Sequence, residues 1–306
     1  MRTYISRGHD GMHSPFTIAP SQFIGRDLGT VTLLKVLGQG SNGIVFIAFQ
    51  RTLKRQVAVK ILLKGPHTTE HSRRLFRQEA EMVAALNHPN IIPIFEMGEA
   101  DDCYFQVMQL VKGNDLETII EKRLKNPLPT RRTLPAGECI RITRQVLDAL
   151  AYAHEEGVVH QDIKPANTLM EERSGRPLIA DFGIARTVQA ETRETGVIVG
   201  SPLYMAPERV RQEPSDHRSD IYSVGVMLFK MLAGMLPLAE HDPMRLLIRK
   251  TRDPDSLFTT KPSETSAAID SRLEAIILKA IATDVTGRYQ TCREFDNDLE
   301  SYSGHM

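Results

Sequence analysis

Short, β-rich apolar runs occupy the first third of the chain, which is the pattern of β-strands. Gaps of only a few residues separate the first three runs, which favours antiparallel hairpins over crossover connections. The predicted strands are residues 31–37, 44–49, 56–63, 91–97 and 104–111. A helix is predicted over 72–86, stopped by Asn87-His88-Pro89. This part of the chain therefore predicts a five-stranded sheet with one helix.

Beyond Gly113 the apolar residues recur with helical spacing. The segment 137–154 places six apolar residues on one helix face: Cys139, Ile142, Val146, Ala149, Leu150 and Ala153. Further helices are expected at 219–233, 242–251 and 268–282, and a loop-rich stretch at 157–214. Residues 1–22 show no periodicity and are interpreted as an N-terminal tail. A small β-rich lobe followed by a larger helical lobe predicts an α+β fold with a ligand cleft near residues 109–115.

Composition narrows the class of protein. The 306 residues include 38 Lys and Arg and 38 Asp and Glu, and this zero net charge argues against a dedicated nucleic-acid-binding protein. The three cysteines are far apart and form no C-x-x-C pair, so no disulfide framework or cysteine zinc site is expected. Neither an apolar run of about 18 residues nor a signal peptide is found, so the expectation is a soluble, cytoplasmic protein without a membrane segment.

A glycine-rich run, Gly38-Gln39-Gly40-Ser41-Asn42-Gly43, lies between two predicted strands. The dinucleotide-binding version of such a run needs a helix after it, whereas a strand follows here. A glycine hairpin can instead lie over a phosphate chain, because its backbone N–H groups approach the ligand with no side chain between. Taken alone, the run is equally compatible with a plain turn.

The next strand places Ala58 and Lys60 on the same face, beside the glycine hairpin. A small residue and a cation there would suit a flat base and its phosphates. Glu79 lies on the apolar stripe of the predicted helix, where a buried carboxylate needs a partner, and Lys60 is the natural candidate. The alternatives are a solvated Lys60 and a Glu79 that reaches water at the edge of the stripe.

Polar residues are concentrated again after Val158-Val159, in His160-Gln161-Asp162-Ile163-Lys164-Pro165-Ala166-Asn167, and Asp181-Phe182-Gly183 follows. Asp162 and Asn167 offer a base and oxygen ligands, and Lys164 offers a positive charge between them. With Asp181 they supply hard oxygen ligands for Mg²⁺ and a cation for phosphate. Each short motif by itself could be a turn, but their order along one chain is informative.

The ordered set resembles the signature motifs of the protein kinase superfamily. The resemblance covers residues 23–303, continues through Ala206-Pro207-Glu208 and Asp220–Gly225, and suggests Arg288 as the partner of Glu208. It implies the bilobal kinase fold, with an N-lobe over 23–111, a hinge at about 109–113 and a C-lobe over 114–303. The amino-acid sequence of residues 88–91 and 181–186 is most similar to bacterial members of the eukaryotic-type Ser/Thr kinase group.

The resemblance also implies a role for each matched residue. Asp162 would accept the proton of the substrate hydroxyl, and Lys164, typical of the Ser/Thr subclass, would contact the γ-phosphate. Lys60 paired with Glu79 would hold the α- and β-phosphates. Asn167 and Asp181 would hold Mg²⁺, with Mn²⁺ as an alternative. The residues expected around ATP are Gly38, Gln39, Gly40, Ser41, Asn42, Gly43, Val45, Ala58, Lys60, Met108, Gln109, Val111, Leu169 and Asp181.

The implied function is transfer of the γ-phosphoryl group of Mg-ATP to Ser or Thr hydroxyls of protein substrates, and self-association for autophosphorylation is left open. The alternatives are a pseudokinase-like ATP-binding scaffold and a small-molecule phosphotransferase. The full set of catalytic residues speaks against the scaffold. Lys164 and the segment 200–208, which resembles the peptide-docking segment of protein kinases, speak against the small-molecule enzyme.

One position departs from the family pattern. Gln161 stands where the family usually has an Arg that pairs with a phosphorylated activation loop, and Gln cannot supply that charge. Thr195 nevertheless resembles an activation-loop phosphorylation site. We therefore expect the activity to depend only weakly on phosphate at Thr195.

Overall fold

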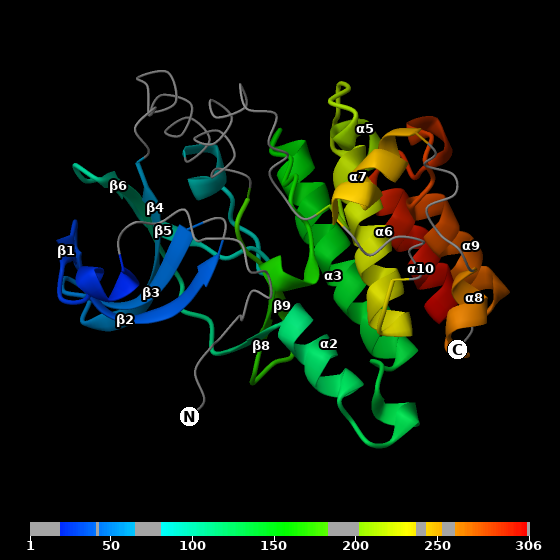
Figure 1. Ribbon diagram of the computed structural model, residues 1–306, viewed down its shortest axis with the longest axis horizontal. Helices are drawn as coiled ribbons and strands as arrows, with labels where there is room; N and C mark the ends of the chain where they lie inside the picture. The colour runs from blue at the N-terminus through cyan, green and yellow to red at the C-terminus, as the bar shows by residue number, and fades with distance from the viewer. Residues whose placement is uncertain are drawn as a thin grey trace. The chain divides into compact units, whose positions relative to one another are not determined.

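The computed structural model describes residues 19–40, 43–64, 81–182, 202–236, 243–252 and 261–304. They divide into two compact units, drawn from blue to cyan and from green to red in Figure 1. Unit 1 contains the described residues up to Asn87 and Ile92–Lys112, and unit 2 contains His88–Ile91 and the described residues from Gly113 onward. The chain thus changes unit between Lys112 and Gly113. The lobe limits of 23–111 and 114–303 stay predictions.

Unit 1 is built on a six-stranded antiparallel sheet in the order β1-β2-β3-β4-β6-β5. The strands are β1 Asp27–Leu28, β2 Val31–Gly40, β3 Gly43–Gln50, β4 Arg55–Leu63, β5 Ile94–Glu99 and β6 Cys103–Met108. The predicted hairpins are confirmed, but β1 was missed because its two residues are too short to show alternation. The strand predicted from residue 91 begins only at Ile94, after Pro93, which has no N–H for a ladder.

One face of this sheet forms the core of unit 1. The buried cluster includes Leu33, Phe46, Val59 and Phe105. A 3-10 helix, η1 Pro20–Phe23, adds Phe23, whose ring centroid lies 6.1 Å from that of Phe46. Residues 1–18 of the predicted tail lie outside the described residues. Of the helix predicted over 72–86, residues 81–84 are described and helical, and the helix ends before Asn87 as expected.

Unit 2 is mainly helical. Its helices are α2 Leu116–Leu124, α3 Ala136–Glu155, α5 Pro207–Val210, α6 Arg218–Ala233, α7 Pro243–Arg252, α8 Pro262–Thr265, α9 Ser271–Ala280 and α10 Cys292–Ser303, with 3-10 turns η2 Pro129–Arg131, η3 Pro165–Asn167 and η6 Val285–Gly287. A small sheet joins β7 Gly113–Asp115, β8 Thr168–Glu171 and β9 Pro177–Ile179. Helix α3 packs against both α6 and α10 (Figure 1).

The helical periodicity read from the sequence is confirmed for α3, where all six residues of the predicted face are buried. Helix α6 is buried on all sides, as expected of a central helix that is apolar all round. The helices predicted at 219–233, 242–251 and 268–282 correspond to α6, α7 and α9. Within the stretch predicted as loop-rich, β8 and β9 were missed, because strands of four and three residues are too short to show a period.

Two further features bear on the chain as a whole. Within the described part of the chain, no helix is long and apolar enough to cross a membrane. Cys103, Cys139 and Cys292 are all buried free thiols, in agreement with the absence of a disulfide framework. Burial raises the pKa of Cys103 and of Cys139 to about 12, so these two remain protonated thiols at neutral pH.

Candidate active site

Four of the residues predicted to contact ATP share one face of the unit 1 sheet. Val45 pairs with Lys60 across β3 and β4, and Ala58 pairs with Met108 across β4 and β6. Directly opposed residues of an antiparallel pair point to the same face, and so do residues two apart, such as Ala58 and Lys60. This face is opposite the one that carries the core cluster with Val59. The sheet therefore gathers the predicted residues on a surface that the core does not use.

Lys60 is only 4% exposed, which excludes the alternative of a solvated surface lysine. An amine at this depth needs polar partners, because an isolated buried charge is costly. Its predicted partner Glu79 lies outside the described residues, so the Lys60–Glu79 pair stays a prediction.

The glycine-rich run is a hairpin between β2 and β3, in which Gly38 pairs with Val45, Gln39 with Ile44 and Gly40 with Gly43. Its tip, Ser41 and Asn42, lies outside the described residues. The strands on both sides confirm the hairpin interpretation over the dinucleotide-binding one.

The fold requires glycine at position 43 of this hairpin but not at position 40. Gly43 has a φ of +121°, and a Cβ there would lie 2.3 Å from the carbonyl oxygen of Ile61, so the fold itself requires glycine. A Cβ on Gly40 would meet no atom of the described residues within 4 Å. The described structure thus gives no reason for glycine at position 40, whereas close approach of a ligand to the backbone would.

The predicted hinge begins at the end of β6. Met108 is buried, and the N–H of Gln109 donates to the carbonyl of Pro93 at 3.2 Å. That N–H is therefore occupied within unit 1. An adenine ring could use the carbonyl of Gln109 and the peptide groups up to Val111.

In unit 2 the three polar residues of the predicted catalytic loop are brought together. Asp162 Oδ2 accepts a hydrogen bond from Lys164 Nζ at 2.7 Å and another from Asn167 Nδ2 at 2.9 Å. Asn167 Nδ2 also donates to the backbone carbonyl of Asp162 at 2.8 Å. With its amide hydrogens directed at Asp162, Asn167 has its amide oxygen left as a possible cation ligand. The loop thus holds a carboxylate, an amine and an amide in one cluster.

The backbone of this loop is held by Asp220, a fully buried residue in the first turn of α6. Its two carboxylate oxygens accept the N–H groups of His160 at 2.8 Å and Gln161 at 2.7 Å. His154 Nε2 lies 2.9 Å from the same carboxylate. Gln161 has a φ of +66°, a conformation that is costly for a residue other than glycine, and these bonds hold it there.

This anchoring role of Asp220 was missed in the sequence. The available signal was a carboxylate within an otherwise apolar helix, which needs buried donors.

His160 joins the catalytic loop to the segment that carries Asp181. Its Nε2 donates to the carbonyl of Ala180 at 3.0 Å, and its Nδ1 accepts the N–H of Asp162 at 3.1 Å. Only a neutral ring with its hydrogen on Nε2 can do both, and burial lowers the pKa of His160, which favours that form. The ring centroid lies 4.5 Å from that of Phe182.

The backbone of Ala180 is fixed on both sides, because its N–H also donates to the carbonyl of Asn167 at 2.9 Å. The next residue, Asp181, has a φ of +62°. Asp181 therefore directly follows a residue, Ala180, whose backbone is hydrogen-bonded to Asn167.

The donor set fits a hard divalent cation. Asn167 and Asp181 supply an amide and a carboxylate oxygen, and Mg²⁺ typically takes one or two protein oxygens and completes its shell with water and substrate phosphates. Within the described ranges, no group of three or more His, Cys, Asp or Glu side chains could hold a metal ion. Because two protein oxygens leave most of the coordination shell to water and phosphate, Asn167 and Asp181 suit an ion that binds together with a phosphate ligand.

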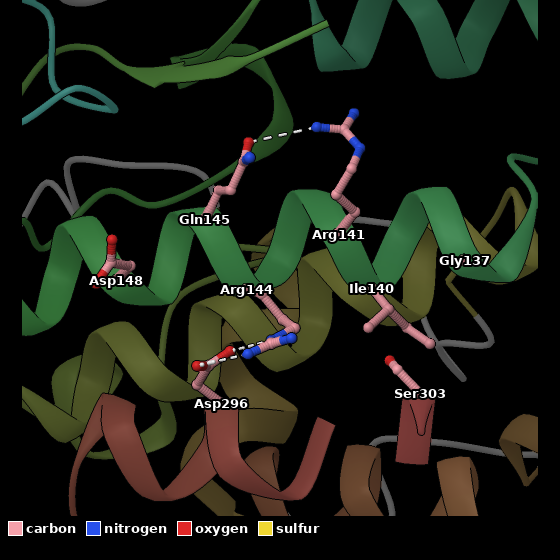
Figure 2. A pocket seen from close by; sticks show the side chains of 8 residues that line it. All are labelled: Gly137, Ile140, Arg141, Arg144, Gln145, Asp148, Asp296 and Ser303. Carbon is pink, nitrogen blue, oxygen red and sulfur yellow. Dashed lines mark hydrogen bonds and ion pairs between the residues drawn. The ribbon is translucent and has the colours of Figure 1, made fainter. Parts of the chain in front are cut away.

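The remaining predicted residue of unit 2, Leu169, is half-buried in β8 opposite Asp115 and Leu178. A separate hollow lies over α3 and α10 (Figure 2), and its lining includes Arg141, Arg144 and Asp296. Its guanidinium groups are already engaged: Arg144 binds Asp296 at 2.7 Å, and Arg141 donates to Gln145 at 3.3 Å. None of the predicted site residues lines this hollow.

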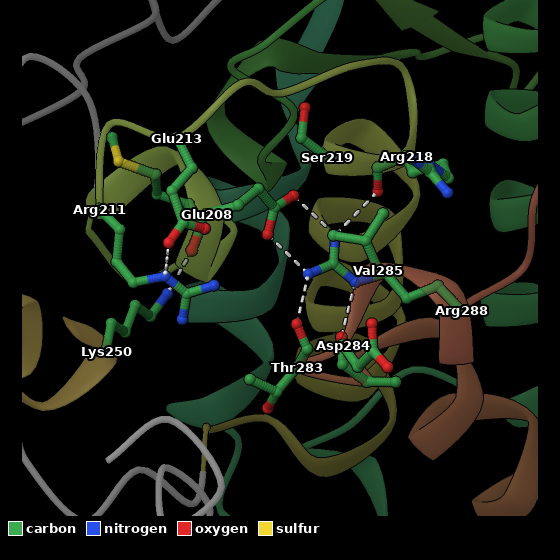
Figure 3. A network of polar contacts seen from close by, with 12 residues as sticks. Glu208, Arg211, Glu213, Arg218, Ser219, Lys250, Thr283, Asp284, Val285 and Arg288 are labelled. Atoms are coloured by element: carbon green, nitrogen blue, oxygen red, sulfur yellow. Dashed lines mark hydrogen bonds and ion pairs between the residues drawn. The ribbon is translucent and has the colours of Figure 1, made fainter. Parts of the chain in front are cut away.

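A buried ion pair joins Glu208 of α5 to Arg288, which directly follows η6. Arg288 binds both carboxylate oxygens of Glu208 at 2.7 Å, and the two side chains are 0% and 4% exposed (Figure 3). The predicted pairing of Arg288 with Glu208 is confirmed. The neighbouring Arg209 donates through Nη1 to the carbonyl of Gln161. A guanidinium therefore lies beside the loop position where the family's Arg is replaced by Gln, a contact that the sequence did not reveal.

Comparison with known proteins agrees with this geometry. The protein kinase domain model matches residues 31–297. The chain is 34% identical over 279 residues to a probable serine/threonine-protein kinase of Clostridium perfringens, covering 90% of this chain and 39% of that protein. It is 33% identical over 274 residues to the serine/threonine-protein kinase PrkC of Bacillus subtilis, covering 89% and 40%.

A crystal structure of the PknI kinase domain of Mycobacterium tuberculosis matches with a TM-score of 0.71 and 28% identity, covering 92% of this chain and 98% of that domain. The chain belongs to the protein kinase family and has its fold. It spans about 40% of the length of the two curated relatives named above.

Proposed function

We propose that this chain is a Ser/Thr protein kinase that transfers the γ-phosphoryl group of Mg-ATP to Ser or Thr hydroxyls of protein substrates. Membership in the kinase family implies ATP and a divalent cation. The observation that carries the proposal is the cluster in which Asp162 receives hydrogen bonds from Lys164 and Asn167. Lys164 in the Asp-x-Lys-x-x-Asn pattern favours Ser/Thr specificity. The buried free thiols support a reducing compartment, for which we infer the cytoplasm.

The chemical work of the chain's own residues is positioning and charge stabilisation. Asp162 orients the acceptor hydroxyl and takes its proton. Lys164, 2.7 Å from Asp162, provides positive charge where the transferred group develops negative charge. A bound Mg²⁺ would neutralise phosphate charge, and Asn167 and Asp181 would hold it. The bonds from Asp220 and His160 keep the loop in place before substrate binds.

Transfer of radiolabelled phosphate from ATP to a generic Ser- and Thr-containing protein tests the proposal, with phosphoamino-acid analysis of the product. Phosphoserine or phosphothreonine that disappears in the Asp162→Asn variant is the expected result. ATP binding without transfer would instead indicate the scaffold. Labelling of hydroxylated metabolites in place of protein would indicate the small-molecule phosphotransferase.

Alanine substitutions at Gly40 and Gly43 should separate nucleotide binding from folding. Gly40→Ala should leave the free energy of unfolding within about 0.5 kcal/mol of wild type, because its Cβ meets no atom of the described residues. It should weaken ATP binding, because the added Cβ would stand between the backbone and the phosphates. Gly43→Ala should cost about 1–3 kcal/mol, because of its positive φ and the Ile61 carbonyl at 2.3 Å. Urea unfolding and ATP titration measure the two effects. Unchanged ATP affinity in Gly40→Ala would contradict the phosphate-loop assignment.

The Gln161 departure leads to a prediction about Thr195, which lies outside the described residues. Thr195→Ala and phosphatase treatment should each leave most of the activity, because Gln161 cannot pair with a phosphate. Initial rates on one peptide for untreated, dephosphorylated and Thr195→Ala enzyme provide the measurement. A loss beyond about tenfold, or about 1.4 kcal/mol of barrier, would refute it and indicate Arg209 as the substitute cation.

A further inference from the structure

Lys250 is a fully buried amine near the end of α7. Its Nζ donates to three backbone carbonyl oxygens: Met205 at 2.6 Å, Pro202 at 2.7 Å and Leu203 at 3.3 Å. These residues immediately precede α5 and belong to the segment 200–208, whose sequence resembles the peptide-docking segment of kinases. A single side chain thus holds most of the carbonyl groups of this short stretch.

The remaining carbonyl in the stretch is held in the same manner. Ser223 Oγ, from α6, donates to the carbonyl of Tyr204 at 2.9 Å. Each of the four consecutive carbonyl groups of residues 202–205 therefore has a side-chain donor from α6 or α7 within hydrogen-bonding distance. The single hydrogen of Ser223 Oγ is shared with the carbonyl of Ser219 at 3.0 Å. The segment has no helix or strand of its own, and these side-chain hydrogen bonds restrain its backbone.

A buried lysine is an expensive way to fill space, since an apolar side chain would pack there without desolvating a charge. What the ammonium adds is its three hydrogens, which match the three carbonyl acceptors. Its Nζ also lies 5.4 Å from the ring centroid of Tyr222, a favourable distance for a cation–π contact. Glu208, whose carboxylate attracts this ammonium group, is already bound on both oxygens by Arg288. The geometry points to a donor role rather than to a packing role.

We propose that Lys250 is a positioning residue for protein substrates: its ammonium group fixes the backbone of residues 202–205 in the form that binds the acceptor peptide. This inference rests on the proposed kinase function and deepens it. Lys250 touches neither ATP nor the acceptor hydroxyl in this scheme. It should therefore affect the affinity for peptide and leave the affinity for ATP unchanged.

The protonation state of Lys250 gives the proposal a distinctive signature. Burial lowers the pKa of Lys250 to about 7, with repulsion from Arg288 lowering it further and attraction to Glu208 opposing. Among the described elements, the facing groups are Glu208 from α5, Tyr222 from α6 and Arg288 after η6. Above pH 7 the neutral amine has two hydrogens for three carbonyls and turns a lone pair toward one of them. Peptide binding should therefore weaken as the pH rises through about 7.

The free energy of unfolding should rise with pH over the range in which peptide binding weakens. In the unfolded chain Lys250 stays protonated up to its ordinary pKa of 10.5, whereas in the folded chain it loses its proton near pH 7. Between these values the unfolded state binds more protons, so the contribution of Lys250 to the free energy of unfolding rises with pH. If Lys250 were purely structural, peptide affinity would increase with pH together with the free energy of unfolding. If Lys250 is a positioning residue, peptide affinity decreases with pH while the free energy of unfolding increases.

Steady-state kinetics between pH 6.0 and 8.5 test the proposal on wild type, Lys250→Met and Lys250→Gln, with one Ser peptide and ATP. Lys250→Met should raise the peptide KM by about tenfold near pH 6, the size expected for losing one or two buried hydrogen bonds. The KM for ATP should stay within about twofold, the precision of such a comparison. Above pH 7 the wild-type peptide KM should rise toward that of Lys250→Gln, which also keeps two N–H donors, and neither variant should show the step. Lys279→Met, an exposed lysine on α9, is the matched control and should behave as wild type.

If Lys250→Met does not fold, Lys250→Gln decides the question, because its amide keeps two N–H donors and does not titrate. A peptide KM for Lys250→Gln that lies above that of wild type at pH 6 and shows no step near pH 7 supports the proposal. A peptide KM of Lys250→Gln at pH 6 that equals that of wild type overturns it. Equal increases in the KM for peptide and for ATP overturn it as well, since they would indicate a general structural defect. A wild type that binds ATP but labels no protein or peptide refutes the proposed function and this inference together, whereas an active wild type with unaffected variants refutes only the inference.

Discussion

Asp162→Asn should lower the rate of phosphoryl transfer by roughly 10²–10⁴-fold, the range for loss of a general base, while ATP binding is retained. An amide oxygen can still accept the hydrogen bonds from Lys164 and Asn167 that Asp162 Oδ2 receives at 2.7 and 2.9 Å, so the loop should keep its shape. An amide cannot take the proton of the acceptor hydroxyl. Initial rates at saturating ATP, nucleotide titration and circular dichroism measure the three quantities.

The control for this variant is Asp148→Asn, which makes the same chemical change on the exposed side of α3, where the Asp148 side chain is 72% exposed. It should retain wild-type activity. Near-normal transfer by Asp162→Asn would remove Asp162 from its assigned role, and a loss of circular dichroism signal would show that its effect is on folding.

Arg288→Met should lower the free energy of unfolding by about 3–5 kcal/mol, as expected when one partner of a buried ion pair is removed. Glu208 would be left buried with an uncompensated charge, because both of its oxygens depend on Arg288. Arg288 Nε also donates to the carbonyl of Ala282 at 2.6 Å, and this bond would be lost too. Urea unfolding followed by circular dichroism gives the free energy.

Two further variants identify the cause of that loss. Adding Glu208→Gln to Arg288→Met should recover part of the stability, because the unpaired charge is then removed. Arg293→Met breaks a pair with Glu155 whose side chains are 70% and 57% exposed, and it should have little effect. A loss in Arg288→Met no greater than in Arg293→Met would show that the buried pair does not stabilise unit 2.

The sequence was most informative where a polar residue interrupts an apolar pattern. Lys60 in an apolar strand and the polar run 160–167 after a pair of valines were recognisable because burial of such residues needs a reason. The structure places Lys164 and Asn167 within hydrogen-bonding distance of Asp162. Helix α3 was equally clear, because its periodicity extends over several turns.

What the sequence could not reveal depends on contacts between distant positions. Asp220 holds the N–H groups of His160 and Gln161 from about 60 residues away, and no local pattern marks that distance. Lys250 lies in a helix with Arg245, Arg249 and Arg252, so its charge alone indicates a solvated face, although its side chain is fully buried. Strand β1 has two residues and β9 has three, too few for any alternation to be recognised.

The three cysteines can report separately on local unfolding in each of the two units. Thiolate is the form that reacts with alkylating reagents, and the burial that raises the pKa of Cys103, Cys139 and Cys292 suppresses it. In the closed protein all three are shielded, so alkylation must wait for transient exposure of the segment that carries each of them. Cys103 belongs to unit 1, and Cys139 and Cys292 belong to unit 2. The native sequence therefore allows the local opening of the two units to be timed separately by mass spectrometry, without any introduced label.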